Sequence, residues 1–310
     1  MYHNVVVLLD GSELAEGVLP HVAEVIRDRG SQVHLLSVSP LARSIVPTTV
    51  ALHSSSEGRP EERSRVQRDL IEYLRVVAKR LEPVAADVWL AVRYGHPADE
   101  ILAFVADVGA DLIAMSTHGR SGISRWVFGS VADRVLRRAT CPVLLVRPSG
   151  SALTASPPYQ HILVPLDGSE LAEQIVPYVK ALVCPNQTRV YLVSVLTMGL
   201  TDRTVTLLTS YPPGLQLTTT TPEYAQVQLQ TYQRSVAAAL REQGAVVHTA
   251  VRRGSPADGI LAYAAEVGAD LIAMTTHGSS GASRWVYGNV AGKVLQEAKT
   301  PVLLVRPTFE

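Results

Sequence analysis

Hydrophobic and polar positions along the chain alternate between two kinds of segment. Short and almost unbroken apolar runs, such as residues 4–9 (NVVVLL) and 111–116 (DLIAMS), are typical of strands buried on both faces of a sheet. Between such runs, apolar residues recur at helical spacing, as they do over residues 12–29 and 61–82. Strands that alternate with helices predict right-handed crossovers and a parallel sheet covered by helices on both faces.

The first half of the chain contains about five such strands, separated by helices. We expect Ser12 to cap the first helix, Pro97 to open a later one, and the last helix to cover residues 129–139. The predicted strands are residues 4–9, 33–39, 88–95, 111–116 and 142–147.

The second half repeats these segments in the same order. Residues 3–22 return as 161–179, residues 95–119 as 254–278, and residues 141–148 as 300–307. A stretch rich in Ser, Pro and Ala, without apolar periodicity, separates the two copies and reads as a linker. We therefore expect two doubly wound α/β domains, at residues 1–148 and 160–310, joined by a linker at 149–159.

A glycine-containing loop leaves the fourth strand of each half and enters the next helix. It reads STHGRSGISRWVFGS from Ser116 and TTHGSSGASRWVYGN from Thr275. Gly119 and Gly122 allow positive φ and a close approach to a ligand, and the helix that starts at Gly129 offers free N–H groups to an anion. A tight turn is the alternative, but the loop is longer than most such connections and its spacing is kept in both copies. The loop therefore predicts a phosphate site.

Two further side chains of each half are candidates for the same site. Asp10 and Asp167 end the first strands, where a carboxylate can accept hydrogen bonds from ribose hydroxyls, join a metal, or only stabilise a turn. His118 and His277 precede a glycine of each loop, with no second ligand at metal-binding spacing. We interpret these histidines as residues that shape the loop or lie beside the ribose.

Composition and absent motifs narrow the function. A net charge of zero and a pI near 7.1 argue against nucleic-acid and anionic-membrane partners. Cys141 and Cys184 have no CxxC neighbours, so we expect free cysteines in a reducing cytoplasm. The apolar run at residues 5–9 is too short for a signal peptide or membrane span. The P-loop, a dinucleotide GxGxxG after the first strand and the hydrolase GxSxG are missing.

These residues resemble the universal stress protein family, whose ATP-binding members carry G-x2-G-x9-G-[ST] in this loop. The first half has Ser116, Gly119 and Gly129-Ser130, and the second has Thr275, Gly278 and Gly288-Asn289. The resemblance implies a Rossmann-like sheet of order 3-2-1-4-5 in each half. It also implies ATP, or ADP or AMP, held with Mg²⁺ or Mn²⁺ at the phosphates.

The same resemblance assigns the parts of the nucleotide to residues of this chain. The backbone of Val38, and of Val195 in the second half, would contact adenine, and Asp10 or Asp167 the ribose. The remaining residues expected at the nucleotide are Gly11, Ser12, Ser116, His118, Gly119, Arg120, Gly122, Gly129 and Ser130, and in the second half Thr275, Gly278, Gly288 and Asn289.

The second half departs further from the family pattern. Thr275 is β-branched and tolerates positive φ poorly, and Asn289 is bulkier than Ser130. We therefore expect the first domain to be the better site. The resemblance describes an ATP-binding stress-response regulator; a slow Mg²⁺-dependent ATPase and a scaffold with a vestigial second site are the alternatives.

Two kinds of segment bear on assembly. The identical runs at residues 142–147 and 301–306 are expected to pair edge to edge between the two domains, and a homo-oligomer is possible besides. The inserts at 42–60 and 198–222 differ between the halves and are expected to be lids, assembly surfaces or plain surface loops.

Overall fold

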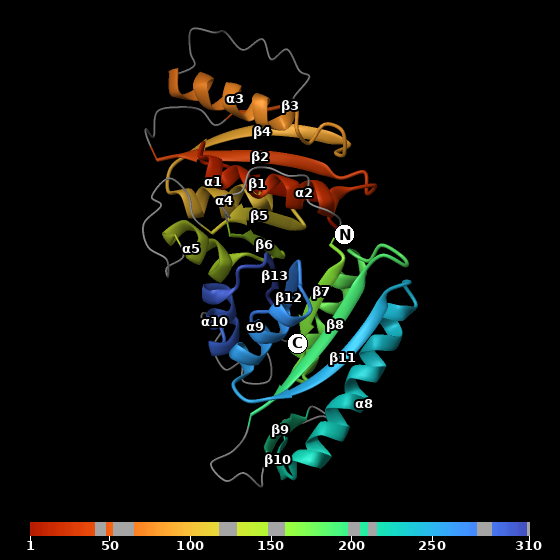
Figure 1. Ribbon diagram of the computed structural model, residues 1–310. Helices are drawn as coiled ribbons and strands as arrows, with labels where there is room; N and C mark the ends of the chain where they lie inside the picture. The colour runs from red at the N-terminus through yellow and green to blue at the C-terminus, as the bar shows by residue number, and fades with distance from the viewer. Residues whose placement is uncertain are drawn as a thin grey trace. The chain divides into compact units, whose positions relative to one another are not determined.

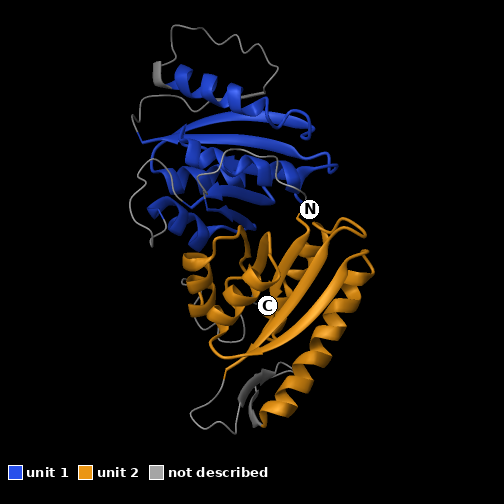
Figure 2. Cartoon of the chain, in the orientation of Figure 1, with its two compact units in different colours: residues 1–157 blue, residues 158–310 orange. Residues whose placement is uncertain are grey.

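The chain forms two compact units, Met1–Pro157 and Pro158–Glu310 (Figure 2). The predicted linker lies almost wholly outside the residues described, so its limits remain a prediction. The computed structural model describes residues 1–40, 48–51, 65–117, 129–147, 159–197, 205–209, 216–277 and 287–308, with the backbone alone at 48–51, 65–66, 205–209 and 216–220.

The first unit contains the parallel sheet that the sequence predicts (Figure 1). Its strands follow the order β4-β2-β1-β5-β6, which is 3-2-1-4-5 when counted along the predicted strands. Val5 of β1 lies opposite Val33 of β2 on one side and Leu112 of β5 on the other. The strands are β1 (Asn4–Leu8), β2 (Gln32–Ser39), β4 (Asp87–Tyr94), β5 (Leu112–Ser116) and β6 (Val143–Val146).

Helices of the first unit cover this sheet. α3 packs on β2 and β4, α4 also contacts β2 and β4, and α4 packs against α5. Strands covered in this way are apolar on both faces, which explains their unbroken hydrophobic runs. The helices are α1 (Glu13–Glu16), α2 (Leu19–Ile26), α3 (Arg65–Ala78), α4 (Pro97–Asp107) and α5 (Ser130–Arg138).

The prediction of one helix over residues 12–29 is wrong, because the structure has two. Ser12 does cap the first of them: its Oγ accepts from Ala15 N at 3.2 Å. α1 then ends at Gly17, and Pro20 lies in the first turn of α2. Proline has no N–H to donate to the carbonyl four residues back, so the helix cannot run through it.

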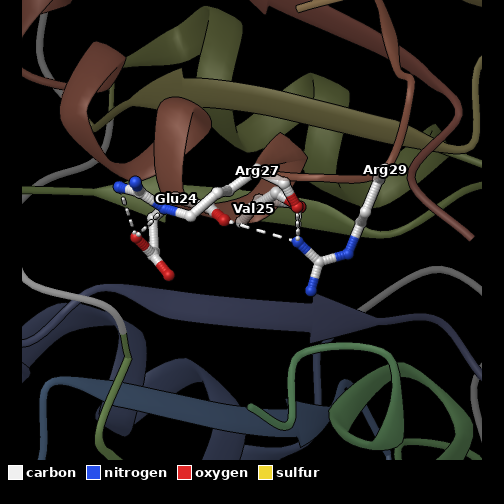
Figure 3. Close-up of polar contacts among 4 residues, drawn as sticks. All are labelled: Glu24, Val25, Arg27 and Arg29. Atoms are coloured by element: carbon white, nitrogen blue, oxygen red, sulfur yellow. Dashed lines mark hydrogen bonds and ion pairs between the residues drawn. The ribbon is translucent and has the colours of Figure 1, made fainter. Parts of the chain in front are cut away.

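A guanidinium closes the carboxyl end of α2 (Figure 3). Arg29 Nη1 donates to the carbonyl oxygens of Val25 at 2.6 Å and Arg27 at 3.1 Å. Arg27 in turn forms an ion pair with the buried Glu24 carboxylate at 3.2 Å. The last carbonyls of a helix have no partner within it, so a cationic donor there stabilises the end of α2.

The second unit repeats the order, as β11-β8-β7-β12-β13. Pro177 again divides the segment after the first strand into two short helices. Its strands are β7 (His161–Pro165), β8 (Arg189–Leu196), β11 (Val246–Arg253), β12 (Leu271–Thr275) and β13 (Val302–Val305), and its helices are α6 (Glu170–Glu173), α7 (Val176–Lys180), α8 (Pro222–Arg241), α9 (Pro256–Glu266) and α10 (Asn289–Glu297).

Both inserts contain strands, which the sequence analysis did not predict. β3 (Thr48–Ala51) lies antiparallel to β4, with Thr48 opposite Val92, and adds a sixth strand to the first sheet. β9 (Val205–Thr209) and β10 (Gln216–Thr220) pair with each other as a separate antiparallel ribbon. These segments are rich in threonine, a β-branched residue that favours strands although it makes them look polar. The other insert residues lie outside the described ones, apart from the start of α8.

Candidate functional site

A tight turn follows the first strand of each unit and fixes an aspartate at the carboxyl end of the sheet. Gly11 has φ 84°, a left-handed conformation that glycine adopts at little cost. This turn lets Asp10 Oδ1 accept from both Ser12 N at 3.0 Å and Ser12 Oγ at 2.6 Å. One carboxylate oxygen therefore has the turn-stabilising role that the sequence left open.

The second unit builds the same turn. Gly168 has φ 88°, and Asp167 Oδ1 accepts from Ser169 N at 3.1 Å and Ser169 Oγ at 2.6 Å. Ser169 Oγ also accepts from Ala172 N at 3.1 Å, so it caps α6 as Ser12 caps α1. The same hydrogen bonds therefore orient Asp10 in the first unit and Asp167 in the second.

The first unit has a cavity of about 320 Å³ where the carboxyl ends of β1, β2 and β5 meet α5. Leu36, Ile101 and Met115 contribute apolar wall. The cavity is also lined by five residues that the sequence predicted for one site, Asp10, Val38, Ser116, Gly129 and Ser130. Residues far apart in the chain meet there because parallel strands end on the same side of the sheet.

The second unit has a corresponding cavity of about 370 Å³. Leu229 reaches it from α8, and Thr276 lines it as Thr117 lines the first cavity. His277 adds a further polar side chain, whose counterpart His118 lies outside the described residues. The predicted residues around it are Asp167, Val195, Thr275, Gly288 and Asn289. The larger Asn289 therefore leaves a cavity similar in size to the first.

Each cavity ends at the start of a helix that lacks a side-chain cap among the described residues. Asp133 N donates to Gly129 O at 3.0 Å, which is the first bond of α5, and the three residues between them line the cavity. In α10 the first bond runs from Gly292 N to Gly288 O at 2.9 Å. Backbone N–H groups in a helix's first turn have no partner within the helix and attract an anion.

The protein backbone does not itself require glycine at position 129. Its φ is −56°, which any residue adopts, and a Cβ there would meet only Thr117 O at an ordinary 3.7 Å. At Gly288 the corresponding contact, with Thr276 O, is tighter at 3.3 Å. A side chain at position 129 therefore fits the fold, so the glycine preserves space at the mouth of the helix.

The expectation that Thr275 has to adopt positive φ is wrong. Thr275 ends β12 in register with Val305, so its backbone is extended, and Ser116 lies equally in β5 opposite Val146. Neither is among the described residues with positive φ. Thr275 Oγ1 instead donates to His277 O at 2.7 Å. The backbone of Thr275 is therefore no reason to expect a weaker second site. The larger side chain of Asn289 is still a reason to expect one.

Five residues predicted for the site cannot be placed. His118, Gly119, Arg120, Gly122 and Gly278 lie outside the described residues and remain predictions from the sequence.

Sequence reasoning missed a tyrosine beside each site. The Tyr73 hydroxyl of α3 is buried and faces the Glu16 carboxylate, without a hydrogen bond of good geometry to any described residue. Burial, followed by the negative charges of Glu16 and Asp10, raises the pKa of Tyr73 far above its ordinary value. Arg80 forms an ion pair with Glu16 at 2.8 Å and opposes this shift. These interactions link α3, which carries Tyr73, to Glu16 of α1 and to Asp10 of the aspartate turn.

Tyr232 of α8 corresponds to Tyr73. Its buried hydroxyl faces the Glu173 carboxylate, again without a hydrogen bond of good geometry in the described part of the chain. Burial and the charges of Glu173 and Asp167 raise the pKa of Tyr232 strongly. It packs against the cluster of Leu196 and Leu229, which both line the second cavity. In the sequence, Tyr73 and Tyr232 occupy equivalent positions of the two halves. This recurrence could have marked them as site residues.

Metal ligands, cysteines and membrane spans each bear on what the described residues can do. Among them, no group of three or more His, Cys, Asp or Glu side chains is arranged to hold a metal ion. Cys141 and Cys184 are free thiols, and burial raises the pKa of Cys141 to about 11. No helix in this part of the chain is long and apolar enough to span a membrane.

Comparison with known proteins gives the family. The model of the Universal stress protein family matches residues 1–147 and again 158–306. Universal stress protein MJ0531 of Methanocaldococcus jannaschii is 30% identical over 148 residues, 47% of this chain and 83% of that protein. Universal stress protein YxiE of Bacillus subtilis is 26% identical over 151 residues, 47% of this chain and 100% of that protein.

A solved structure extends the likeness to the whole fold. The crystal structure of a universal stress protein from Archaeoglobus fulgidus superposes with a TM-score of 0.67 at 19% identity, covering 99% of each chain. At this identity the likeness concerns the fold alone. Since the family model matches each unit in turn, the chain belongs to the universal stress protein family and carries two of its domains in tandem.

Proposed function

We propose that both units bind adenine nucleotides and that the protein is an ATP-binding regulator of a stress response. One observation carries the proposal: in each unit, the residues predicted for base, ribose and phosphate line a single cavity. Volumes of about 320 and 370 Å³ are within the range of small-molecule sites.

Each part of the nucleotide has a suitable partner in the first cavity. The apolar wall near Leu36 and Ile101 suits a base, with the Val38 backbone at its edge. The Asp10 carboxylate can accept hydrogen bonds from the ribose hydroxyls. The amides that follow Gly129 and the Ser130 hydroxyl can donate to phosphate, at about 1.5–3 kcal/mol for each bond to a charged group.

A divalent cation would arrive with the phosphates. Mg²⁺ readily keeps several waters and binds through substrate phosphates with only one or two carboxylates. Asp10 and Asp167 are the carboxylates that line the described parts of the two cavities. Mg²⁺ or Mn²⁺, when bound, would neutralise part of the phosphate charge.

A regulatory role suits the site better than fast turnover. Among the described residues of the first cavity, the only candidate base for activating water is Asp10, whose Oδ1 is engaged by Ser12. Slow Mg²⁺-dependent ATP hydrolysis is the enzymatic alternative. A scaffold with a vestigial second site is the structural alternative, against which the size of the second cavity argues.

We also propose that the two units associate through their last strands. The runs PVLLVR at 142–147 and 301–306 are identical, and an apolar edge strand of this kind is a ready partner for another edge. Separately expressed halves should then form dimers or mixed heterodimers on size exclusion. Halves that remain strictly monomeric would contradict this pairing.

Nucleotide binding is tested by native mass spectrometry and thermal unfolding with Mg²⁺ and ATP. We expect up to two nucleotides per chain and a rise in melting temperature, since a ligand specific to the folded state stabilises it. Gly129→Leu and Gly288→Leu should each remove one nucleotide. Because Asn289 replaces the serine, Gly129→Leu should remove the tighter site. A specific site should have a dissociation constant below roughly 1 mM. Failure to bind ATP at about that concentration would overturn the proposal.

A further inference from the structure

The second cavity contains a histidine that is held in place by its neighbour. Thr276 Oγ1 lies 3.0 Å from His277 Nδ1, and the Thr276 side chain is itself 4% exposed. The backbone is fixed as well, because Thr275 Oγ1 donates to His277 O at 2.7 Å. The imidazole is therefore oriented by a buried hydroxyl on a constrained turn.

This turn is joined directly to the start of α10. Gly288 N donates to Thr276 O at 3.0 Å, and Thr276 N donates to Val305 O at 2.9 Å. His277 therefore lies beside the helix start, where Gly288, Asn289 and Val290 line the same cavity. This is the end of the cavity at which the proposed function places phosphate.

The charges around the cavity single out this side chain. Among the described lining residues, Asp167 is the only acidic one, and His277 is the only one whose side chain can become a cation. Other charges nearby are Arg306, which follows Val305 on β13, and Lys293 of α10, which pairs with Asp258. Neither lines the cavity, so among the described residues an anionic ligand there would meet amides, hydroxyls and His277.

The hydrogen bond to Thr276 determines which nitrogen meets a ligand. No described residue bonds to Nε2, whereas Nδ1 is occupied by the hydroxyl. If the hydroxyl donates to Nδ1, the neutral ring carries its proton on Nε2; if the ring is a cation, Nδ1 donates to the hydroxyl. In both of these states Nε2 can donate to a phosphate oxygen. In the third, a neutral ring whose Nδ1–H donates to the hydroxyl, Nε2 is an acceptor and donates only after the ring takes up a proton.

We propose that His277 binds a phosphate group of the nucleotide through Nε2 in the second cavity, with Thr276 as its positioning residue. The inference rests on the proposed nucleotide binding and adds a side-chain donor to it. The counterpart of His277 in the first half, His118, lies outside the described residues.

The test uses full-length protein carrying Gly129→Leu, so that the first cavity is blocked. Calorimetric titration with Mg²⁺ and ATP should show His277→Gln weakening binding about tenfold or more, the effect of losing one hydrogen bond to a charged group. Thr276→Val should weaken ATP binding in the same direction but less. Adenosine, followed by ligand-observed NMR, should bind these variants within about twofold of their parent, since it has no phosphate. His248→Gln, which alters an exposed histidine of β11 outside the cavity, is the matched control.

The outcomes separate this inference from the proposed function. Equal losses for ATP and adenosine, or no loss at all, would overturn the role of His277 while leaving nucleotide binding intact. ATP binding to wild-type protein but not to Gly129→Leu would also overturn it, because the second cavity would then be no nucleotide site. If neither protein binds any nucleotide, the proposed function itself fails.

A second measurement does not depend on the folding of a variant. With ¹⁵N-labelled histidine in the Gly129→Leu protein, the Nε2 resonance of His277, assigned by its loss in His277→Gln, should shift on adding ATP and stay in place with adenosine. An Nε2 resonance unmoved by saturating ATP would contradict the proposal.

Discussion

Ser12 donates its hydroxyl to Asp10 Oδ1 at 2.6 Å and accepts from Ala15 N at 3.2 Å, so one side chain both orients the aspartate and caps α1. Ser12→Ala should lower the free energy of unfolding by about 1 kcal/mol, the usual cost of losing such a cap. It should also weaken nucleotide binding by the first unit, because Asp10 loses its fixed orientation. Urea denaturation and calorimetry measure the two effects.

Ser169→Ala is the matched control for this prediction, since it breaks the same contact with Asp167. It should act on the second site only. If either substitution weakens binding at both sites equally, the aspartate turn is not acting locally.

Replacing Tyr73 by phenylalanine should cost no stability in the absence of ligand. Its buried hydroxyl faces Glu16 but has no hydrogen bond of good geometry with a described residue, and a buried group left unsatisfied costs about 1–3 kcal/mol. Tyr73→Phe and Tyr232→Phe should therefore leave the free energy of unfolding unchanged or raise it. A loss above about 1 kcal/mol in urea denaturation would reveal a partner beyond the described residues.

His21 should make the protein sensitive to acid. Burial lowers its pKa from 6.5 to about 4, so the folded protein resists a proton that the unfolded chain accepts. The stabilisation is complete above pH 6.5 and is lost as pH falls toward 4, by up to about 3 kcal/mol. Chemical denaturation across this range measures it.

The second unit supplies a matched substitution for His21. Tyr178 occupies the corresponding place in α7, so His21→Tyr introduces a side chain that this position of the repeat already holds and removes the titration. The slope of unfolding free energy against pH should become shallower between pH 6.5 and 4. An unchanged slope would assign the acid sensitivity to other groups.

Arg29→Ala should destabilise the end of α2 (Figure 3). The guanidinium donates to the Val25 carbonyl at 2.6 Å, and its removal leaves that oxygen to water. We expect a loss of about 1 kcal/mol in the free energy of unfolding, with faster amide exchange confined to α2. Arg29→Lys keeps a cationic donor and should lose less. Equal losses from both variants would mean that the guanidinium geometry is required.

Much of the fold could be predicted because the same pattern of strands and helices occurs in both halves of the sequence. Buried parallel strands such as β5 are apolar throughout, so they are visible without any tertiary information. Once their order is known, the carboxyl ends of β1, β2 and β5 must lie together. Asp10, Val38 and Ser116 could therefore be assigned to one site although they are far apart in the chain.

What the sequence could not supply depends on contacts between distant segments. β3 is a strand because β4 offers an open edge, which no local pattern reveals. Tyr73 lies near Asp10 because α3 packs beside the turn, and its helical position alone predicts only burial. The extended backbone of Thr275 likewise follows from its pairing with Val305.

The two inserts leave the sheet at the same point, after its second strand, but end differently. In the first unit β3 adds to β4, whereas in the second β9 and β10 pair together and no described strand lies on the outer side of β11. The order of the five parallel strands is the same in both cases. This position therefore tolerates large changes of sequence without loss of the core or the cavity. It is where the two halves of a duplicated gene can diverge first, and where a foreign segment could be grafted into either domain.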